Sequence, residues 1–199
     1  EENERKVFAP AYRLAPESPY PAALEDVLES YEYLLSCGYG AEDIFLCGES
    51  AGGGLVYALL LKLKEKGLPM PRGVIALSPW VDLTFSGKSF LTNKDRDPSL
   101  TKERLEYYAS LYGGDALDPF VSPVFGNLEG LPPSIVFVGG AEILLDDSVL
   151  LHNTLLEKGN QSRLVVTKDM WHVYTLYDGL KESQKDMNKI RDFIKKIEG

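Results

Sequence analysis

The sequence predicts an α/β fold in three layers, with a mostly parallel sheet between two layers of helices. Short apolar runs alternate with longer segments of helical periodicity, which is typical of parallel strands joined by helices. The runs are apolar at successive positions, and this pattern indicates strands buried on both faces. With 199 residues, 44% of them hydrophobic, the chain can form a single domain over residues 1–199 with a sizeable core.

Five apolar runs are predicted to be strands, at residues 7–12, 44–47, 72–77, 135–138 and 163–167. The first run contains Pro10, which lacks the backbone N–H that a central strand donates. It is therefore the least strand-like of the five.

Helices are expected between these runs. Pro21 suits the first turn of a helix that continues to Cys37, where Gly38 ends it. The other expected helices run from Ala51 to about Lys66, from the N-cap Thr101 to Tyr112, over residues 146–158 and over residues 180–197.

Residues 83–124 interrupt the pattern with irregular, polar sequence around the helix that follows Thr101. We expect this excursion to lie over the carboxyl ends of the strands, where parallel sheets bind ligands, and to cover the ligand site. Four of its side chains would then contact the ligand, or would only pack the excursion against the core: Phe85, Phe90, Leu91 and Tyr108.

Charge and composition exclude several classes of partner. The net charge of −9 has no basic block to offset it, so neither nucleic acid nor an anionic membrane is expected to bind. Cys37 and Cys47 are too few for a disulfide framework and predict a reducing, cytoplasmic compartment. No apolar run has the length of a membrane span, and the charged N-terminal residues do not form a signal peptide.

A strand-to-helix turn at residues 48–52, Gly-Glu-Ser-Ala-Gly, has the pattern of a nucleophile elbow. Such a turn holds Ser50 in a strained backbone conformation that needs small neighbours, here Gly48 and Gly52. The backbone N–H of Ala51 would face an oxyanion at the helix N-terminus. The alternative is a glycine-rich turn in which Ser50 is only an N-cap or part of an anion cradle.

A serine hydroxyl needs a base in contact with it, and the chain has two histidines. His152 lies in the middle of a predicted helix and is better explained as a helix-face residue. His172 follows the last predicted strand, on a loop from which it could reach Ser50. We therefore predict that His172 is the general base.

The acid that orients the base has several candidates. Glu142 lies just past the fourth predicted strand, the position that such an acid occupies. Asp146 is better explained as a helix N-cap and Asp147 as a first-turn charge, although either could serve. Asp82, at the end of the third predicted strand, remains a further alternative.

Five segments in order resemble the hormone-sensitive-lipase-like esterases: Tyr12-Arg13-Leu14-Ala15-Pro16-Glu17, Gly48-Glu49-Ser50-Ala51-Gly52-Gly53, Ser78-Pro79-Trp80-Val81-Asp82-Leu83, Gly130-Leu131-Pro132-Pro133 and the loop around His172. The resemblance covers nearly the whole chain. It implies an α/β-hydrolase fold and cofactor-free carboxylesterase activity on short or medium acyl chains, with no metal. It also implies that Ser50 is the nucleophile, His172 the base and Glu142 the acid.

The sequence departs from that family in three ways. Glu142 stands where the family usually has Asp, and Ala11 stands where it has Asp before the Tyr-Arg-Leu-Ala-Pro-Glu segment. The His-Gly-Gly motif that donates to the oxyanion hole, the first strands and the N-terminal cap segment are expected upstream and are not in this sequence. We expect either a fragment of a longer hydrolase or a short relative with a one-sided oxyanion hole, and an exposed sheet edge that promotes self-association.

The expected partner is a small-molecule ester. Substrate contacts are predicted for Glu49, Trp80, Phe85, Phe90 and Val173. The last strand or the final helix is the surface that would pair subunits in a homodimer. Two alternatives stay open: a non-catalytic binding protein on the same scaffold, and a serine peptidase or amidase.

Overall fold

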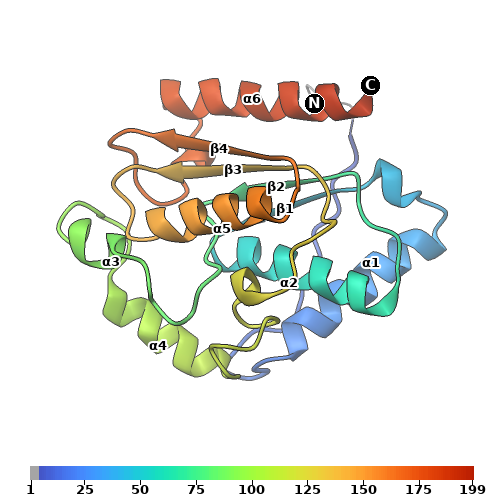
Figure 1. Cartoon of the computed structure of the whole chain (residues 1–199), viewed down its shortest axis with the longest axis horizontal. Coiled ribbons are helices and arrows are strands. Elements are labelled where there is room, and N and C mark those ends of the chain that lie inside the picture. Colours follow the sequence, from blue (N-terminus) through green and yellow to red (C-terminus); the bar gives the residue numbers. More distant parts are fainter. Residues whose placement is uncertain (1–4) are drawn as a thin grey trace.

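The computed structural model describes residues 5–199 and contains one parallel sheet (Figure 1). Its four strands are β1 (Phe45–Glu49), β2 (Gly73–Leu77), β3 (Ser134–Gly139) and β4 (Ser162–Thr167). They lie in the order β1-β2-β3-β4, and each neighbouring pair is parallel. The expected parallel sheet is therefore confirmed, with each strand within a few residues of a predicted run.

Helices cover both faces of the sheet, as expected for three layers. In Figure 1, α6 (Lys181–Glu198) runs over one face, while α2 (Ala51–Lys66) and α5 (Leu145–Glu157) lie on the other. The remaining elements are α1 (Ala22–Ser36), which packs against α2, α3 (Ser89–Thr92), α4 (Lys102–Tyr112) and three short 3₁₀ helices, η1 (Ala41–Asp43), η2 (Pro123–Phe125) and η3 (Tyr174–Leu176).

The first predicted strand, residues 7–12, is wrong: this segment has no regular secondary structure. Pro10 removes one ladder donor, and β1 pairs only with β2. The side chain of Val7 is 91% exposed, and the ring of Phe8 packs against Tyr33 of α1 instead of entering the sheet. A strand needs a neighbour, and this segment has none among the described residues.

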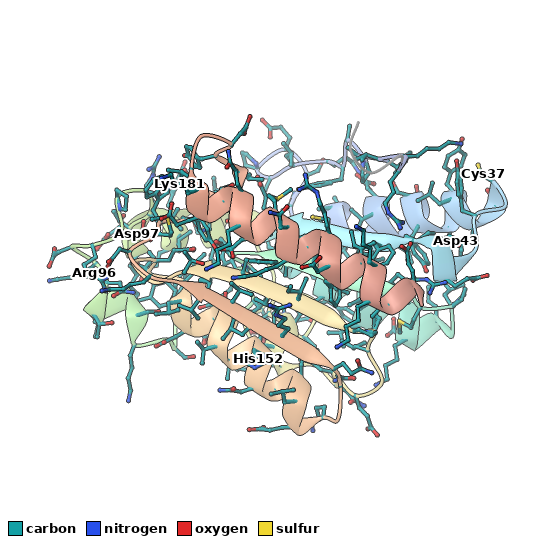
Figure 2. All side chains as sticks on the ribbon, turned by 90° about the horizontal axis from the view of Figure 1, so that it is seen from above. Cys37, Asp43, Arg96, Asp97, His152 and Lys181 are labelled. Atoms are coloured by element: carbon teal, nitrogen blue, oxygen red, sulfur yellow. The ribbon has the colours of Figure 1, made fainter. Side chains whose placement is uncertain are left out.

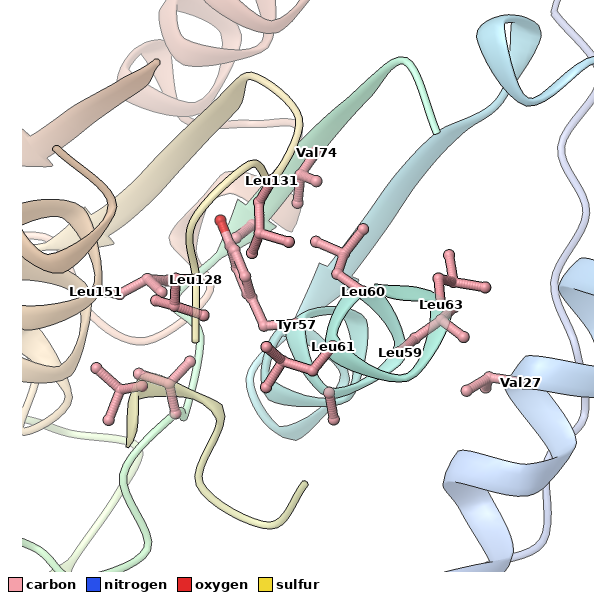
Figure 3. Close-up of a cluster of buried hydrophobic side chains, with 14 of the residues drawn as sticks. Val27, Tyr57, Leu59, Leu60, Leu61, Leu63, Val74, Leu128, Leu131 and Leu151 are labelled. Atoms are coloured by element: carbon pink, nitrogen blue, oxygen red, sulfur yellow. The ribbon is translucent and has the colours of Figure 1, made fainter. Parts of the chain in front are cut away.

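The larger hydrophobic core lies between the sheet and α2 (Figure 3). Tyr57, Leu60 and Leu63 of α2 are fully buried in this core, and Tyr57 and Leu60 point toward Val74 of β2 and the connecting segment that contains Leu131. A fully buried leucine contributes about 2 kcal/mol relative to an exposed one. The helix that follows Ser50 is therefore held rigidly against the sheet.

A smaller core fills the opposite face. Ile75 and Leu77 alternate along β2 with Val74 and Ala76, so the strand contributes to both cores. Phe193 of α6 belongs to this second core. The two central strands, β2 and β3, are buried at every position, in agreement with the continuous apolar runs.

The edge strands differ from the expectation of full burial. Cys47 of β1 is exposed, and Val166 of β4 is 47% exposed. Each edge strand has a neighbour on one side only, so its outward positions lack the covering that the central strands receive. Self-association through such an edge and pairing of subunits stay predictions.

The excursion, residues 83–124, contains α3, α4 and η2. Thr101 caps α4 as expected, because its side chain accepts a hydrogen bond from the Arg104 N–H. Figure 2 places Arg96 and Asp97 of this excursion at the opposite end of the molecule from Cys37 and Asp43, which precede β1. The excursion therefore lies at the carboxyl ends of the strands. Within residues 5–199, no helix is both long enough and apolar enough to cross a membrane.

Candidate active site

Ser50 occupies the sharp turn between β1 and α2. Its backbone has φ 51° and ψ −123°, the strained conformation expected of the elbow. The Ser50 N–H donates to the Leu77 carbonyl at 2.9 Å, and the Trp80 N–H donates to the Ser50 carbonyl at 2.9 Å. The end of β2 thus holds the turn on both sides.

The sequence predicted that Gly48 and Gly52 must both be small, and only Gly48 has close contacts that require it. A Cβ atom on Gly48 would lie 2.3 Å from the Gly52 carbonyl oxygen, so Gly48 is required, as expected. A Cβ on Gly52 would meet nothing within 4 Å, so no contact within the described residues explains why this position is a glycine. Gly53 and Gly54 are the other restricted positions, because their Cβ atoms would collide with Pro79 and with the Trp80 carbonyl oxygen.

His172 lies on the loop between β4 and η3 and contacts both Ser50 and Glu142. Its Nε2 atom is 2.9 Å from Ser50 Oγ, and its Nδ1 atom is 2.8 Å from Glu142 Oε2. The His172 side chain is 8% exposed. With the proton on Nδ1, the ring donates to the carboxylate and accepts the serine hydroxyl through Nε2.

Glu142 lies three residues after the end of β3 and is completely buried. Its Oε2 atom faces His172, and its Oε1 atom accepts hydrogen bonds from the Ser78 hydroxyl and the Gly139 N–H. Asn93 of the excursion donates to the Glu142 carbonyl at 2.7 Å. The carboxylate thus has donors on both oxygens, which a buried charge requires.

The other acidic candidates are engaged elsewhere. The Asp146 carboxylate accepts a hydrogen bond from the Ser89 N–H. Asp146 lies inside α5, which begins at Leu145, so the prediction that it is the N-cap is wrong. Asp147 accepts two backbone N–H groups of residues 81–82 at 3.1 and 3.0 Å, and burial followed by the nearby charge of Asp82 raises its pKa to about 8. Asp82 itself accepts hydrogen bonds from the loop that follows it.

Comparison with known proteins identifies the family of the chain. Residues 1–176 match a family model described as alpha/beta hydrolase fold. A crystal structure of an esterase from the bacterial hormone-sensitive lipase family superposes with a TM-score of 0.92 and 43% sequence identity, over 95% of this chain and 65% of that chain. The chain belongs to the α/β-hydrolase family, in its hormone-sensitive-lipase-like branch.

Curated relatives of this α/β-hydrolase carry related names. An acetyl-hydrolase of Streptomyces hygroscopicus is 39% identical over 173 residues, which is 86% of this chain and 58% of that protein. An esterase of Acinetobacter venetianus is 35% identical over 191 residues, which is 94% of this chain and 63% of that protein. The chain therefore spans about 60% of the length of these relatives.

His152 of this α/β-hydrolase lies on α5 (Figure 2), and its Nδ1 atom is 2.8 Å from the hydroxyl of Ser162 on β4. Burial lowers the pKa of this imidazole. The contact with Ser162 is at the amino end of β4, away from the elbow, which agrees with the interpretation of His152 as a helix-face residue.

Close backbone packing brings the histidine loop of the α/β-hydrolase to Glu142. A Cβ on Gly139 would lie 2.2 Å from the Met170 carbonyl oxygen, so only glycine allows the loop to pass the end of β3. The Met170 carbonyl also accepts the Ala141 N–H at 3.0 Å. The loop is anchored after His172 as well, where the Tyr174 hydroxyl donates to Asp186 of α6.

Ala51 is the first residue of α2, so its N–H has no acceptor within the helix and lies at the positive end of the helix dipole. It can donate to an oxyanion at the elbow. Among residues 5–199, no group of three or more His, Cys, Asp or Glu side chains is arranged as a metal site.

The predicted substrate contacts of the α/β-hydrolase occupy different environments. Trp80 and Phe90, 7% and 3% exposed, lie in a small core between the excursion and the segments that follow β2 and β3. Phe85 is partly exposed, with its ring centroid 6.0 Å from that of Trp80 and 5.4 Å from that of Phe90. Glu49 is exposed at the end of β1, and Val173 is partly exposed after His172. Phe85 is thus the one aromatic ring of the three that a ligand can reach without displacing core.

Leu91 and Tyr108, the remaining predicted acyl contacts, are 73% and 45% exposed. Sequence reasoning missed Ser78, whose hydroxyl contacts Glu142. Its signals in the sequence were its position at the end of an apolar run and its place in the Ser78-Pro79-Trp80 segment of the family resemblance.

Proposed function

We propose that this α/β-hydrolase cleaves carboxylic esters of short or medium acyl chains through an acyl-enzyme formed on Ser50. The observation that carries the proposal is the hydrogen-bonded series from Ser50 through His172 to Glu142, with distances of 2.9 and 2.8 Å. A serine hydroxyl at a strained turn, in contact with a base that a carboxylate orients, is the arrangement of an activated nucleophile.

In the first half-reaction, Ser50 Oγ attacks the ester carbonyl while His172 Nε2 takes the hydroxyl proton. Glu142 accepts the Nδ1–H bond and stabilises the imidazolium that results. The Ala51 N–H donates to the oxyanion of the tetrahedral intermediate. Collapse of this intermediate breaks the ester bond, and His172 gives its proton to the leaving alcohol.

In the second half-reaction, a water molecule replaces the alcohol. His172 Nε2 takes one proton from this water, and the resulting hydroxide attacks the acyl carbon on Ser50. The second tetrahedral intermediate collapses with the serine oxygen as leaving group, and His172 returns the proton to it. Carboxylic acid and free Ser50 are the products, so no cofactor is consumed.

The strength of the oxyanion site decides the rate. Removal of one donor from such a site costs about 10²–10³ in kcat. Ala51 is the donor that the described residues provide at the elbow. The turnover number of the 199-residue chain therefore measures how much oxyanion stabilisation the Ala51 N–H provides by itself.

The proposed acyl site lies beside Phe85, at the excursion that we expect to cover Ser50. The name acetyl-hydrolase of the Streptomyces relative supports a small acyl group. A solved structure of EstE5, 40% identical to this chain with a TM-score of 0.90, was soaked with p-nitrophenyl butyrate. That ester is therefore a suitable first substrate.

The test compares the chain with Ser50→Ala on p-nitrophenyl acetate, butyrate and decanoate, and on the matching p-nitroanilides. We expect ester turnover that falls to background in Ser50→Ala, with the amides much slower. Covalent labelling of Ser50 by an organophosphate, followed by mass spectrometry, detects an activated serine independently. Equal ester rates in the two proteins, together with no labelling, would favour the non-catalytic binding protein. Equal rates on esters and amides would favour an amidase.

A further inference from the structure

Ser78 links the proposed acid to the loop that carries the proposed base. It follows β2 directly, is 1% exposed, and its hydroxyl has two partners. The hydroxyl donates to Glu142 Oε1 at 2.7 Å and accepts the Val173 N–H at 3.1 Å. Since Val173 is the residue after His172, one side chain contacts both the Glu142 carboxylate and the backbone next to His172.

The backbone at Ser78 is strained in a way that glycine would relieve. Its φ is 48°, in the left-handed region that disfavours side chains with a Cβ atom. The Ser78 N–H donates to the Phe137 carbonyl at 2.7 Å, which fixes this conformation. Ser50, Ser78 and Val173 all have positive φ, so three strained residues meet at one site. Strain of this kind persists only where the surrounding structure enforces it, and it clusters at functional sites.

The carboxylate of Glu142 needs a donor on the oxygen that does not face His172. A completely buried carboxylate without such donors would be costly to keep charged. Glutamate also has one more rotatable bond than the aspartate that the family usually has. Oε1 accepts hydrogen bonds from the Ser78 hydroxyl and the Gly139 N–H, and Ser78 is the side chain of this pair. Together the two donors remove the rotational freedom that the longer side chain would otherwise have.

We propose that Ser78 is a positioning residue of the hydrolytic reaction. Its hydroxyl holds the Glu142 carboxylate and the backbone after His172 in one hydrogen-bonded unit. The Nδ1–H bond then stays aligned when the imidazolium forms. Ser78 keeps its own proton throughout and touches no reacting atom. This role rests on the proposed ester hydrolysis.

The kinetic test uses Ser78→Ala and the matched variant Ser134→Ala. Ser134 is also 1% exposed, but it lies at the amino end of β3, where its hydroxyl donates to the Pro132 carbonyl. We expect Ser78→Ala to lower kcat by about tenfold with KM changed less than about twofold, on the scale of one hydrogen bond to a charged group. Ser134→Ala should keep kcat within about twofold of the parent. Equal losses in the two variants would mean that Ser78 is only structural.

A double-mutant cycle tests whether Ser78 acts through Glu142. In a Glu142→Gln background, Ser78→Ala should lower kcat by less than about twofold, because the carboxylate that it positions is already gone. A full, additive tenfold loss in that background would overturn the proposal. Ser78→Gly, which adopts a positive φ without strain, replaces Ser78→Ala if the alanine variant unfolds. Undiminished kcat in the glycine variant would also overturn it.

A measurement without turnover separates this proposal from the proposed function. The chain has two histidines, so the ring N–H resonances of His172 can be followed by NMR with His152 as an internal reference. We expect Ser78→Ala to move the His172 Nδ1–H resonance upfield and to leave His152 unchanged. An unchanged His172 resonance would contradict the positioning role. If the parent chain is inactive but Ser78→Ala still shifts the His172 resonance, ester hydrolysis is rejected and the hydrogen bonds of Ser78 to Glu142 and the histidine loop are supported.

Discussion

The Nε2 atom of His172 lies 2.9 Å from the Oγ atom of Ser50, although 122 residues separate them in the chain. The two residues follow β4 and β1, which are the opposite edges of the four-stranded sheet. The contact exists because the loop after β4 passes over the end of β3, where Gly139 leaves room for it. The loop after β4 therefore crosses the end of the sheet and brings His172 to Ser50 at the opposite edge.

The two histidines provide a matched pair of variants. His172→Asn should lower kcat by about 10⁶, because Ser50 then has no base in contact. His152→Asn should keep kcat within about twofold, since its hydrogen bond is to Ser162 on β4. Steady-state hydrolysis of p-nitrophenyl butyrate measures both. A similar loss in the two variants would refute the assignment of the base.

The acid can be tested against the carboxylates that the sequence left open. Glu142→Gln should lower kcat by about 10²–10⁴, because the amide can no longer stabilise the imidazolium. Asp146→Asn should change kcat by less than about threefold, since Asp146 accepts the Ser89 N–H and not the imidazole. Circular dichroism of both variants checks that they fold. A larger loss in Asp146→Asn than in Glu142→Gln would reverse the assignment.

The elbow glycines differ in the space around them. Gly48→Ala should destabilise the protein by about 2–3 kcal/mol and abolish turnover, since its Cβ would collide with the Gly52 carbonyl oxygen. Gly52→Ala meets no atom within 4 Å and replaces a helical glycine, so it should be neutral or stabilise the isolated chain. Urea denaturation measures both changes. Equal destabilisation would show that the turn does not have the described geometry.

Asp147 gives the stability a pH dependence of known sign. Burial raises its pKa to about 8 in the folded protein, against 3.8 as the ordinary value. Between these values the unfolded chain has lost a proton that the folded chain keeps, so this group's contribution to stability is full below about pH 4 and is lost as the pH rises toward 8. Asp147→Asn keeps an oxygen for the Val81 and Asp82 N–H groups and does not titrate.

Urea unfolding at pH 5 and pH 8 tests this dependence. The free energy of unfolding of the parent should fall more steeply over that interval than that of Asp147→Asn, because all other groups are common to both proteins. Parallel changes in the two proteins would contradict the raised pKa of Asp147.

Phe85 and Phe90 separate substrate contact from packing. Phe85→Ala should raise KM for p-nitrophenyl butyrate several-fold more than for the acetate, because the partly exposed ring would contact the longer acyl chain. Phe90→Ala should lower the free energy of unfolding by about 3 kcal/mol, as expected for a ring that is 3% exposed. An equal change of KM for both esters in Phe85→Ala would leave Phe85 as a packing residue.

The elements of the fold were predictable from local patterns. The runs at 44–47, 72–77, 135–138 and 163–167 are strands, because each is a short apolar segment between turn signals. The prediction of a strand at residues 7–12 is wrong, since a strand depends on a neighbouring strand that local sequence does not reveal. Helix ends were predicted within about two residues where a glycine or an N-cap marked them, as at Gly67 and Thr101.

By itself, the sequence determined the parallel sheet, the turn at Ser50 and the short set of histidines and acids that could serve it, because these depend on periodicity and on residue type. Only the tertiary structure decided that Glu142, and not Asp146, contacts His172, and that Ser78 lies between Glu142 and the histidine loop. These contacts join the ends of β2, β3 and β4, and the direction of a side chain after each strand depends on how the strands pair and where the loops cross. That information is in the packing of the whole chain and not in any one segment.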